Sequence, residues 1–451
     1  MTSLIRSAVR RFGPTSGLRF SARLYSESAK SVRRGDATST SKYELVGVVV
    51  NNDANNSSAT TNEDVSLSID YKARNEPRRT TVSVKWLRDH CRSDTLYNWQ
   101  TRQRKDDMTG LSGKAQLLPD AQASDPLAKH GVLLHPDSQT IQLNWKDGHK
   151  TVFDIDTLLD LYHLPADTDV SPLQQLWTGE SLKKLPVVEA ANSAEFAKNF
   201  VKYGIVAVEG VGHENGAATK ALCETIAPFH TTFYEDFWVF SNQAQQSKDE
   251  QYHEDTAYSN EALAPHTDGT YFEQTPGIQV FHCLHPAASG GDTILVDGFN
   301  AVRQLHLSNP HAFDVLTRTL VPHHYLEGEV IDARCDVFPV IRLDSDGRLH
   351  QVRFNPYDRA PFKARKGTTV SDIADFYKSY EALARLMNDQ SASLRVPLRP
   401  GTVLFIDNYR VLHGRTAFSG YRQLCGCYLS RDAFLSKARR HIPSVYRHDV
   451  S

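Results

Sequence analysis

The sequence predicts a mainly β protein with surrounding helices, an α+β arrangement whose larger domain is a jelly roll of two sheets. Many short apolar runs of strand length alternate with turn residues between about residues 204 and 429. Two histidines and an aspartate, which could together bind one metal ion, lie next to such runs. Short strands that bring metal ligands together are typical of a jelly roll with helices packed around it. We expect a small β-rich domain in front of it.

The composition excludes several classes of protein. The 451 residues contain 51 basic and 53 acidic side chains, so the charge balance gives no reason to expect nucleic-acid binding. The chain has no apolar run of the length that a membrane span requires. Its six cysteines are scattered along a large chain, which indicates reduced thiols inside the cell and not a disulfide framework.

The first 26 residues differ from the rest of the chain. They contain five arginines and several serines, and no acidic residue occurs before Glu27. On a helix Leu4, Ile5, Val9 and Phe12 would lie on one side, so residues 1–26 have the make-up of a mitochondrial transit peptide. The predicted location is the mitochondrial matrix. A disordered basic tail is the alternative.

Residues 27–64 are mostly polar and include the Asn/Ser-rich stretch Asn51–Ser58, so a linker or low-complexity segment is expected there. Residues 65–180 are assigned to the small N-terminal domain. Its predicted strands are Val82–Leu87, Gly131–Leu134, Thr140–Trp145 and Thr151–Phe153. Asp147-Gly148 between the last two runs is a strong hairpin signal.

Residues 181–440 are assigned to the jelly roll, and residues 441–451 to a C-terminal tail. A helix capped by Ser193 is expected first. A longer helix from Ser371 to about Met387 has Phe376, Tyr380 and Leu383 on one side. Between and after them the predicted strands are Gly204–Val208, Ile278–Leu284, Asp292–Val296, Val337–Ile341, Leu349–Phe354, Val403–Ile406 and Leu424–Leu429.

The residues with the clearest chemistry are His266, Asp268 and His413. The first two are at positions i and i+2, which puts both side chains on one face of a strand or of its end. Two imidazoles and one carboxylate are the ligand set of ferrous iron in non-haem oxygenases, which leaves three coordination positions open. Arg422 follows nine residues after His413 and could bind a dicarboxylate co-substrate with its planar guanidinium.

Around these residues the chain resembles the γ-butyrobetaine hydroxylase and trimethyllysine dioxygenase branch of the Fe(II)/2-oxoglutarate oxygenases, and the mitochondrial trimethyllysine dioxygenases most closely. The resemblance extends from about Val84 to Leu435. It rests on long strings, which are Val84–Cys91, Gly277–Leu284, Leu295–Phe299, Arg410–Arg415 and Gly420–Leu429. It implies a double-stranded β-helix catalytic domain in which His266, Asp268 and His413 bind iron and Arg422 binds the distal carboxylate of 2-oxoglutarate. Thr293 is expected to donate a further hydrogen bond to that co-substrate.

The substrates of this family contain a trimethylammonium group, which has no N–H donor and is bound by aromatic faces. The resemblance assigns such a cage to Tyr234, Trp238, Tyr258 and Tyr428. Asp255 stands where γ-butyrobetaine hydroxylase has asparagine, and it could pair with the α-ammonium of trimethyllysine. An ordinary surface acid is the alternative for Asp255. Asn355 is expected to contact the substrate carboxylate.

The implied reaction hydroxylates N6,N6,N6-trimethyl-L-lysine at C-3 with O2 and 2-oxoglutarate, the first step of carnitine synthesis, with ascorbate as reductant. The alternatives are γ-butyrobetaine hydroxylase and a non-enzymatic binding or scaffold protein on the same barrel. A homodimer is a family expectation. No structural zinc is expected, because only Cys91 and His149 stand where the family has three cysteines and a histidine, and Ser93 and Leu96 replace the other thiols.

Overall fold

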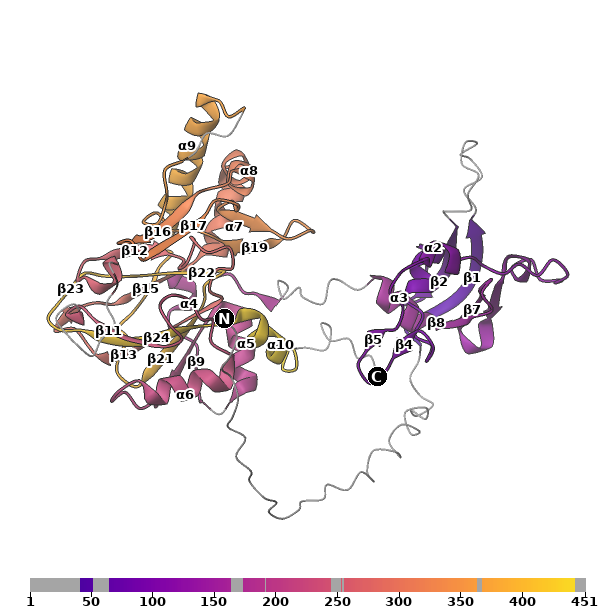
Figure 1. Ribbon diagram of the computed structural model, residues 1–451, viewed down its shortest axis with the longest axis horizontal. Helices are drawn as coiled ribbons and strands as arrows, with labels where there is room; N and C mark the ends of the chain where they lie inside the picture. Colours follow the sequence, from indigo (N-terminus) through magenta and orange to yellow (C-terminus); the bar gives the residue numbers. More distant parts are fainter. Residues whose placement is uncertain are drawn as a thin grey trace, which may run out of the picture. The chain divides into compact units, whose positions relative to one another are not determined.

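The structure is a computed structural model that describes residues 41–51, 65–163, 173–190, 192–244, 253, 255–362 and 367–442. The predicted transit peptide, residues 52–58 of the Asn/Ser-rich stretch and the end of the tail lie outside these residues. The described residues form two compact units, one ending at residue 163 and one starting at residue 173 (Figure 1). Each unit has its own core.

The first unit contains two antiparallel three-stranded sheets with short helices and one small hairpin. The first sheet has the order β1 (Tyr43–Asn51), β2 (Ser66–Ala73) and β3 (Glu76–Ser83), and the second has the order β6 (Val132–His135), β7 (Thr140–Asn144) and β8 (Lys150–Asp154). The helices are α1 (Val84–Asp89), α2 (Leu111–Lys114) and α3 (Ile155–His163), and the hairpin pairs β4 (Tyr97–Asn98) with β5 (Gln103–Arg104). Side chains of both sheets share one apolar core, in which Trp145 is fully buried.

Two expectations for this unit are wrong. Residues 43–51 were assigned to a polar linker, yet they form β1, because Leu45 and Val48 are buried in the core of the unit. The run Val82–Leu87 was expected to be one strand. Instead β3 ends at Ser83, whose side chain accepts a hydrogen bond from the Lys85 backbone N–H and so caps α1.

The second unit is built on two sheets. A six-stranded sheet has the order β11 (Trp238–Ser241), β24 (Gln423–Leu429), β13 (Ile278–His285), β21 (Thr402–Asp407), β10 (Ile205–Glu209) and β9 (Val187–Val188). A four-stranded sheet has the order β12 (Leu263–His266), β22 (Val411–Arg415), β15 (Thr293–Asp297) and β20 (Leu394–Val396). Three two-stranded ribbons complete it, β14 (Ser289–Gly290) with β23 (Phe418–Ser419), β16 (His323–Glu327) with β17 (Ile331–Cys335), and β18 (Ile341–Leu343) with β19 (Leu349–Val352).

The two large sheets face each other, as expected for a jelly roll. Leu404 and Ile406 of β21 belong to the same core as Leu295 of the other sheet, whereas Val403 and Phe405 point to the opposite face. This alternation follows from the period of two in a strand. The predicted jelly-roll arrangement of the second unit is therefore confirmed.

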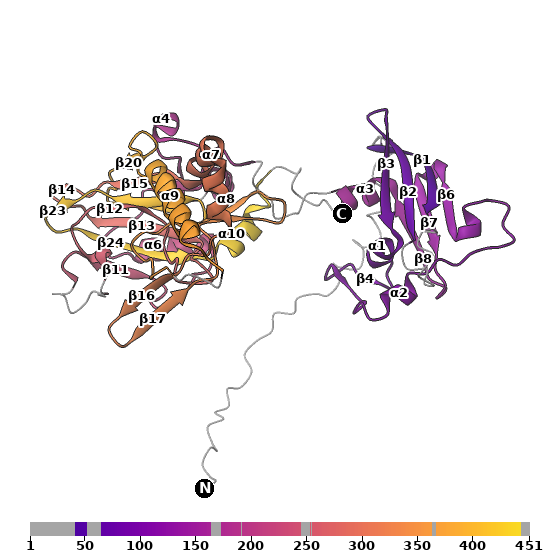
Figure 2. The same ribbon diagram turned by 90° about the horizontal axis from the view of Figure 1, so that it is seen from above.

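Helices cover the two outer faces of this sandwich. The outer face of the six-stranded sheet packs against α5 (Ser193–Tyr203), α6 (Ala217–Ile226) and α10 (Arg431–Ala438). The four-stranded sheet packs against α7 (Gly298–Ser308), α8 (Pro310–Arg318) and α9 (Val370–Met387), which lie together in both views (Figures 1 and 2). The ribbon β16–β17 extends away from the sandwich (Figure 2).

Three boundaries of the second unit differ from the prediction. Residues 173–180 were assigned to the small domain, but Trp177 is buried between the two large sheets, and the short helix α4 (Gly179–Leu182) packs on β20. The cap of α5 is Asn192, not Ser193, because the Asn192 side chain accepts from the Glu195 N–H. The strand predicted from Val337 starts only at Ile341.

The search for membrane spans covered the described residues alone, and there it finds no helix long and apolar enough to cross a membrane.

Candidate metal centre and substrate cavity

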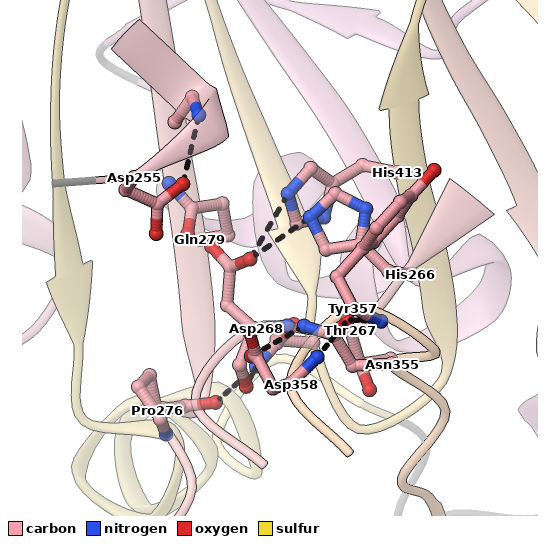
Figure 3. A network of polar contacts seen from close by, with 12 residues as sticks. Asp255, His266, Thr267, Asp268, Pro276, Gln279, Asn355, Tyr357, Asp358 and His413 are labelled. Atoms are coloured by element: carbon pink, nitrogen blue, oxygen red, sulfur yellow. Dashed lines mark hydrogen bonds and ion pairs between the residues drawn. The ribbon is translucent and has the colours of Figure 1, made fainter. Parts of the chain in front are cut away.

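Strand pairing brings the three predicted metal ligands together. His266 is the last residue of β12 and pairs in register with His413 of β22, and Asp268 follows just after β12. The Asp268 Oδ1 lies 3.3 Å from the His266 Nε2 and 3.4 Å from the His413 Nε2. Figure 3 shows the carboxylate pointing at both imidazoles. Within the described ranges this is the one group of three or more His, Cys, Asp and Glu side chains that converges as metal ligands do.

Neighbouring polar groups fix the orientation of the ligands. The His266 Nδ1 lies 2.9 Å from the Ala264 carbonyl oxygen, so the proton belongs on Nδ1 and the Nε2 lone pair faces the cluster. The Asn408 side chain accepts from the Asp268 N–H at 2.9 Å and donates to the Asp268 carbonyl at 3.0 Å. The backbone turn that presents Asp268 is therefore held from both sides.

The electrostatics of the cluster favour an ionised Asp268 carboxylate, which suits the binding of a cation. Burial by itself raises the pKa of Asp268, but the nearby imidazoles of His413 and His266 outweigh it and lower the pKa well below the usual range. The carboxylate is thus anionic, and its second oxygen accepts from the Tyr428 hydroxyl at 3.0 Å. Two imidazoles and one carboxylate with facing donor atoms fit the facial ligand set of ferrous iron.

A cavity of about 360 Å³ opens from this cluster. All eleven site residues named from the sequence line it, which are Tyr234, Trp238, Asp255, Tyr258, His266, Asp268, Thr293, Asn355, His413, Arg422 and Tyr428. They come from distant parts of the chain, so the fold brings every one of them to the same place.

Arg422 immediately precedes β24, Thr293 is the first residue of β15, and both line the cavity. The Arg422 guanidinium is buried, lies over the Phe418 ring at 5.3 Å and donates one long hydrogen bond of 3.4 Å to the Gly291 carbonyl. No ion pair joins it to a carboxylate of the described residues, and burial lowers its pKa. A dicarboxylate in the cavity would provide the missing anionic partner.

Three of the four predicted aromatic residues lie close together. The Trp238 ring is 4.8 Å from Tyr428 and 6.4 Å from Tyr234, each in an edge-to-face arrangement. The Tyr258 ring lies 5.3 Å from the Phe240 ring and lines the same cavity. Because the Tyr428 hydroxyl bonds to Asp268, this aromatic wall lies next to the metal ligands.

Sequence reasoning missed two further tyrosines of the wall. The Tyr271 hydroxyl lies 2.9 Å from the Tyr234 hydroxyl, and Tyr325 of β16 is 5.8 Å from the Tyr234 ring. Both line the cavity. The position of Tyr271 three residues after Asp268 was a usable signal. Nothing in the sequence connects Tyr325 with the site, because the ribbon β16–β17 reaches it only through tertiary packing.

Asp255 is partly buried and lines the cavity, so the alternative of an ordinary surface acid is wrong. Its carboxylate accepts from the Ala257 N–H at 2.7 Å. Arg415 holds the surrounding loop, because its guanidinium donates to the backbone carbonyls of Thr256, Ala257, Ser259 and Glu261. The loop with Asp255 and Tyr258 is thereby tied to β22, two residues from His413.

Asn355 is almost fully buried, and most of its carboxamide is engaged within the protein. Its Nδ2 donates to the Asp358 Oδ2 at 2.6 Å, and its Oδ1 accepts from the Tyr357 N–H at 3.0 Å. One N–H therefore remains for a ligand. The predicted contact of Asn355 with a substrate carboxylate stays a prediction.

In the first unit Cys91 and His149 meet, as their resemblance to zinc ligands would require. The Cys91 Sγ lies 3.2 Å from the His149 Nε2, and the Ser93 Oγ lies 3.3 Å from the same nitrogen. A hydroxyl thus occupies the position of a third ligand, and the three groups form hydrogen bonds. The expectation that no zinc binds stays a prediction.

Comparison with known proteins agrees with this geometry. Residues 169–428 match the Taurine catabolism dioxygenase TauD, TfdA family, and residues 59–159 match the family Gamma-butyrobetaine hydroxylase-like, N-terminal. The mitochondrial trimethyllysine dioxygenases of Bos taurus and Homo sapiens are 37% and 36% identical over 367 residues, which are 78% of this chain and 81% of each relative. The gamma-butyrobetaine dioxygenase of Homo sapiens is 26% identical over 372 residues, which are 78% of this chain and 89% of that relative.

The two family matches together cover both units, and the trimethyllysine dioxygenases are more similar to this chain than the gamma-butyrobetaine dioxygenase is. The chain therefore belongs to the TauD, TfdA family of dioxygenases and, within it, to the trimethyllysine dioxygenases.

Proposed function

We propose that the chain hydroxylates N6,N6,N6-trimethyl-L-lysine at C-3. O2 and 2-oxoglutarate are consumed, and 3-hydroxy-trimethyllysine, succinate and CO2 are formed, so one oxygen atom enters the product and one enters succinate. The observation that supports this most is the aromatic wall of Tyr234, Trp238 and Tyr428 next to the His266–Asp268–His413 cluster in one cavity. A quaternary ammonium group placed against such rings is held without hydrogen bonds.

The residues of the chain have separate tasks in this reaction. His266, Asp268 and His413 would hold Fe(II), which supplies the activation of O2. Arg422 would bind the distal carboxylate of 2-oxoglutarate, with Thr293 donating a further hydrogen bond. The aromatic cage would hold the trimethylammonium end of the substrate, and Asp255 would hold the other end. These two contacts together decide which carbon faces the metal. The buried walls exclude bulk water.

Replacing Arg422 by methionine should raise the KM for 2-oxoglutarate by about 30-fold or more, because removal of one partner of a buried charge pair costs at least ~2 kcal/mol. The measurement is succinate release at varied 2-oxoglutarate with saturating trimethyllysine. Arg303→Met is the matched control, since Arg303 is exposed on α7. An unchanged KM in the Arg422 variant would show that the co-substrate binds elsewhere.

The alternative substrate is γ-butyrobetaine, which has a carboxylate and no α-ammonium. Asp255 disfavours it, because a carboxylate placed next to a second carboxylate is repelled. Succinate release with the two substrates in parallel tests the choice. We expect kcat/KM to be higher for trimethyllysine, and turnover of γ-butyrobetaine alone would contradict the proposal. Catalysis with either substrate would exclude a scaffold protein without activity.

The proposal includes the cellular setting. The relatives are named mitochondrial, and we infer that this chain is mitochondrial too, in the matrix. Ascorbate would keep the iron reduced between turnovers. A homodimer is expected, whereas nucleic-acid and membrane partners are not.

A further inference from the structure

A second acid lines the substrate cavity together with Asp255. Asp358 lies in the loop after β19, three residues past Asn355, and the sequence analysis did not single it out. The Asp358 Oδ2 accepts a hydrogen bond from the Asn355 Nδ2 at 2.6 Å, and the Asp358 backbone carbonyl accepts one from the His324 N–H at 2.8 Å. The carboxylate is thereby held in place on the cavity wall near the metal ligands (Figure 3).

The charge of Asp358 is balanced only in part by the surrounding protein, through the nearby His266 imidazole and the Asn355 carboxamide. Within the described ranges no Lys or Arg forms an ion pair with it, and its carboxylate accepts a hydrogen bond from the Asn355 carboxamide. Burial, together with the nearby carboxylates of Asp255 and Asp268, raises the pKa of Asp358 to about 7. Burial and Asp268 also raise the pKa of Asp255.

Arg415, an arginine close to the Asp255 carboxylate, already donates its hydrogen bonds to other groups. Arg415 directs its guanidinium N–H groups at backbone carbonyls of residues 256–261. Two partly buried acids of one cavity repel each other and are costly to keep ionised when neither forms an ion pair with a Lys or Arg of the described residues. A cationic ligand group that reaches both would remove this cost. The aromatic wall provides a place for one cation, and the two acids provide a place for a second one.

We propose that Asp358 is a second specificity residue of the substrate site and that it holds the α-ammonium of an amino-acid substrate jointly with Asp255. This inference rests on the proposed function. Asn355 then acts as a positioning residue, since its carboxamide directs Asp358. The site selects a ligand with a quaternary ammonium at one end and a primary ammonium at the other. Trimethyllysine has both groups, whereas γ-butyrobetaine lacks the second.

The test compares two substrates that differ in the α-ammonium alone, trimethyllysine and 6-(trimethylammonio)hexanoate. The Asp358→Asn variant keeps the size of the side chain and an acceptor for Asn355, and removes the charge. We expect its kcat/KM for trimethyllysine to fall about 10- to 100-fold, the range for a lost hydrogen bond to a charged group. Its kcat/KM for the deamino compound should stay within about twofold of the wild-type value, because that compound has no ammonium to lose.

Two further variants sharpen the result. Asp346→Asn is the control, because Asp346 is half exposed in the hairpin turn between β18 and β19. This variant should leave kcat/KM unchanged for both substrates. Asp358→Glu retains the charge and should recover part of the preference for trimethyllysine. Equal losses for both substrates in Asp358→Asn would overturn the inference and leave Asp358 a structural support of its loop. The inference would also be overturned if the Asp358→Asn and Asp358→Glu variants showed the same preference for trimethyllysine over the deamino compound. Failure of the wild-type protein to hydroxylate trimethyllysine would instead contradict the proposed function.

Discussion

Replacing His266 by alanine should abolish turnover and reduce the bound iron. His266 provides one of three ligand atoms that lie within 4.8 Å of one another, and its Nδ1 contact with Ala264 directs the Nε2 to the metal position. Two remaining ligands do not form a stable facial site. The loss of the metal's contribution, several kcal/mol of transition-state stabilisation, should lower kcat by about 1000-fold or more. The measurements are succinate release and the iron content of the purified protein.

His285 gives the matched control. It lies exposed at the end of β13, and its Nδ1 is 3.0 Å from the Pro286 carbonyl, outside the metal cluster. His285→Ala should keep both iron and activity. Undiminished iron and succinate release in the His266 variant would show that the assignment of the metal ligands is wrong. Loss of both properties in the two variants alike would point to damage of the fold.

Replacing Arg410 by methionine should lower the free energy of unfolding by about 3–5 kcal/mol, because it leaves the buried Asp297 carboxylate without its partner. Both side chains are at most 1% exposed, and the guanidinium forms two hydrogen bonds to the carboxylate at 3.1 and 2.8 Å. Further bonds join Arg410 to the Lys202 and Gln175 carbonyls. Asp297 also accepts from the Phe299 N–H at the start of α7. The pair thus connects β15, β22, α5 and α7.

The measurement is denaturant unfolding, with the two units followed by separate probes. Arg385→Met is the matched control, because Arg385 forms an exposed ion pair with Glu381 one helical turn away on α9. Such a pair contributes less than ~1 kcal/mol. If Arg410→Met lowered the free energy of unfolding by as little as the control does, the buried pair would not be what holds these elements together.

Strands with strong patterns were readable from the sequence. The runs around Ile205, Ile278, Val403 and Leu424 became β10, β13, β21 and β24, the centre of the six-stranded sheet. These strands are apolar on both faces because a second sheet covers one face and helices cover the other. The long helix near Phe376 was equally clear, and it begins at Val370, one residue earlier than predicted.

Segments with weak patterns were misread where tertiary contacts decide. The run around Val84 alternates as a strand would, but the Ser83 cap turns it into α1. Residues 43–51 are rich in valine and were grouped with the polar segment on either side of them. They form a strand that pairs with β2 at eight positions. The strands β11, β12, β16, β17 and β22 are short and were not predicted as elements.

The sequence by itself determined the chemistry of this protein. The residue types and spacings of His266, Asp268, His413 and Arg422, with the long matching strings around them, were sufficient to identify a ferrous dioxygenase of the trimethyllysine group. Only the tertiary structure decided which other side chains face the substrate. Tyr271, Tyr325 and Asp358 reach the cavity from a turn, a ribbon and a loop. Side-chain identity does not encode such placements, because they depend on how distant segments pack against the two sheets.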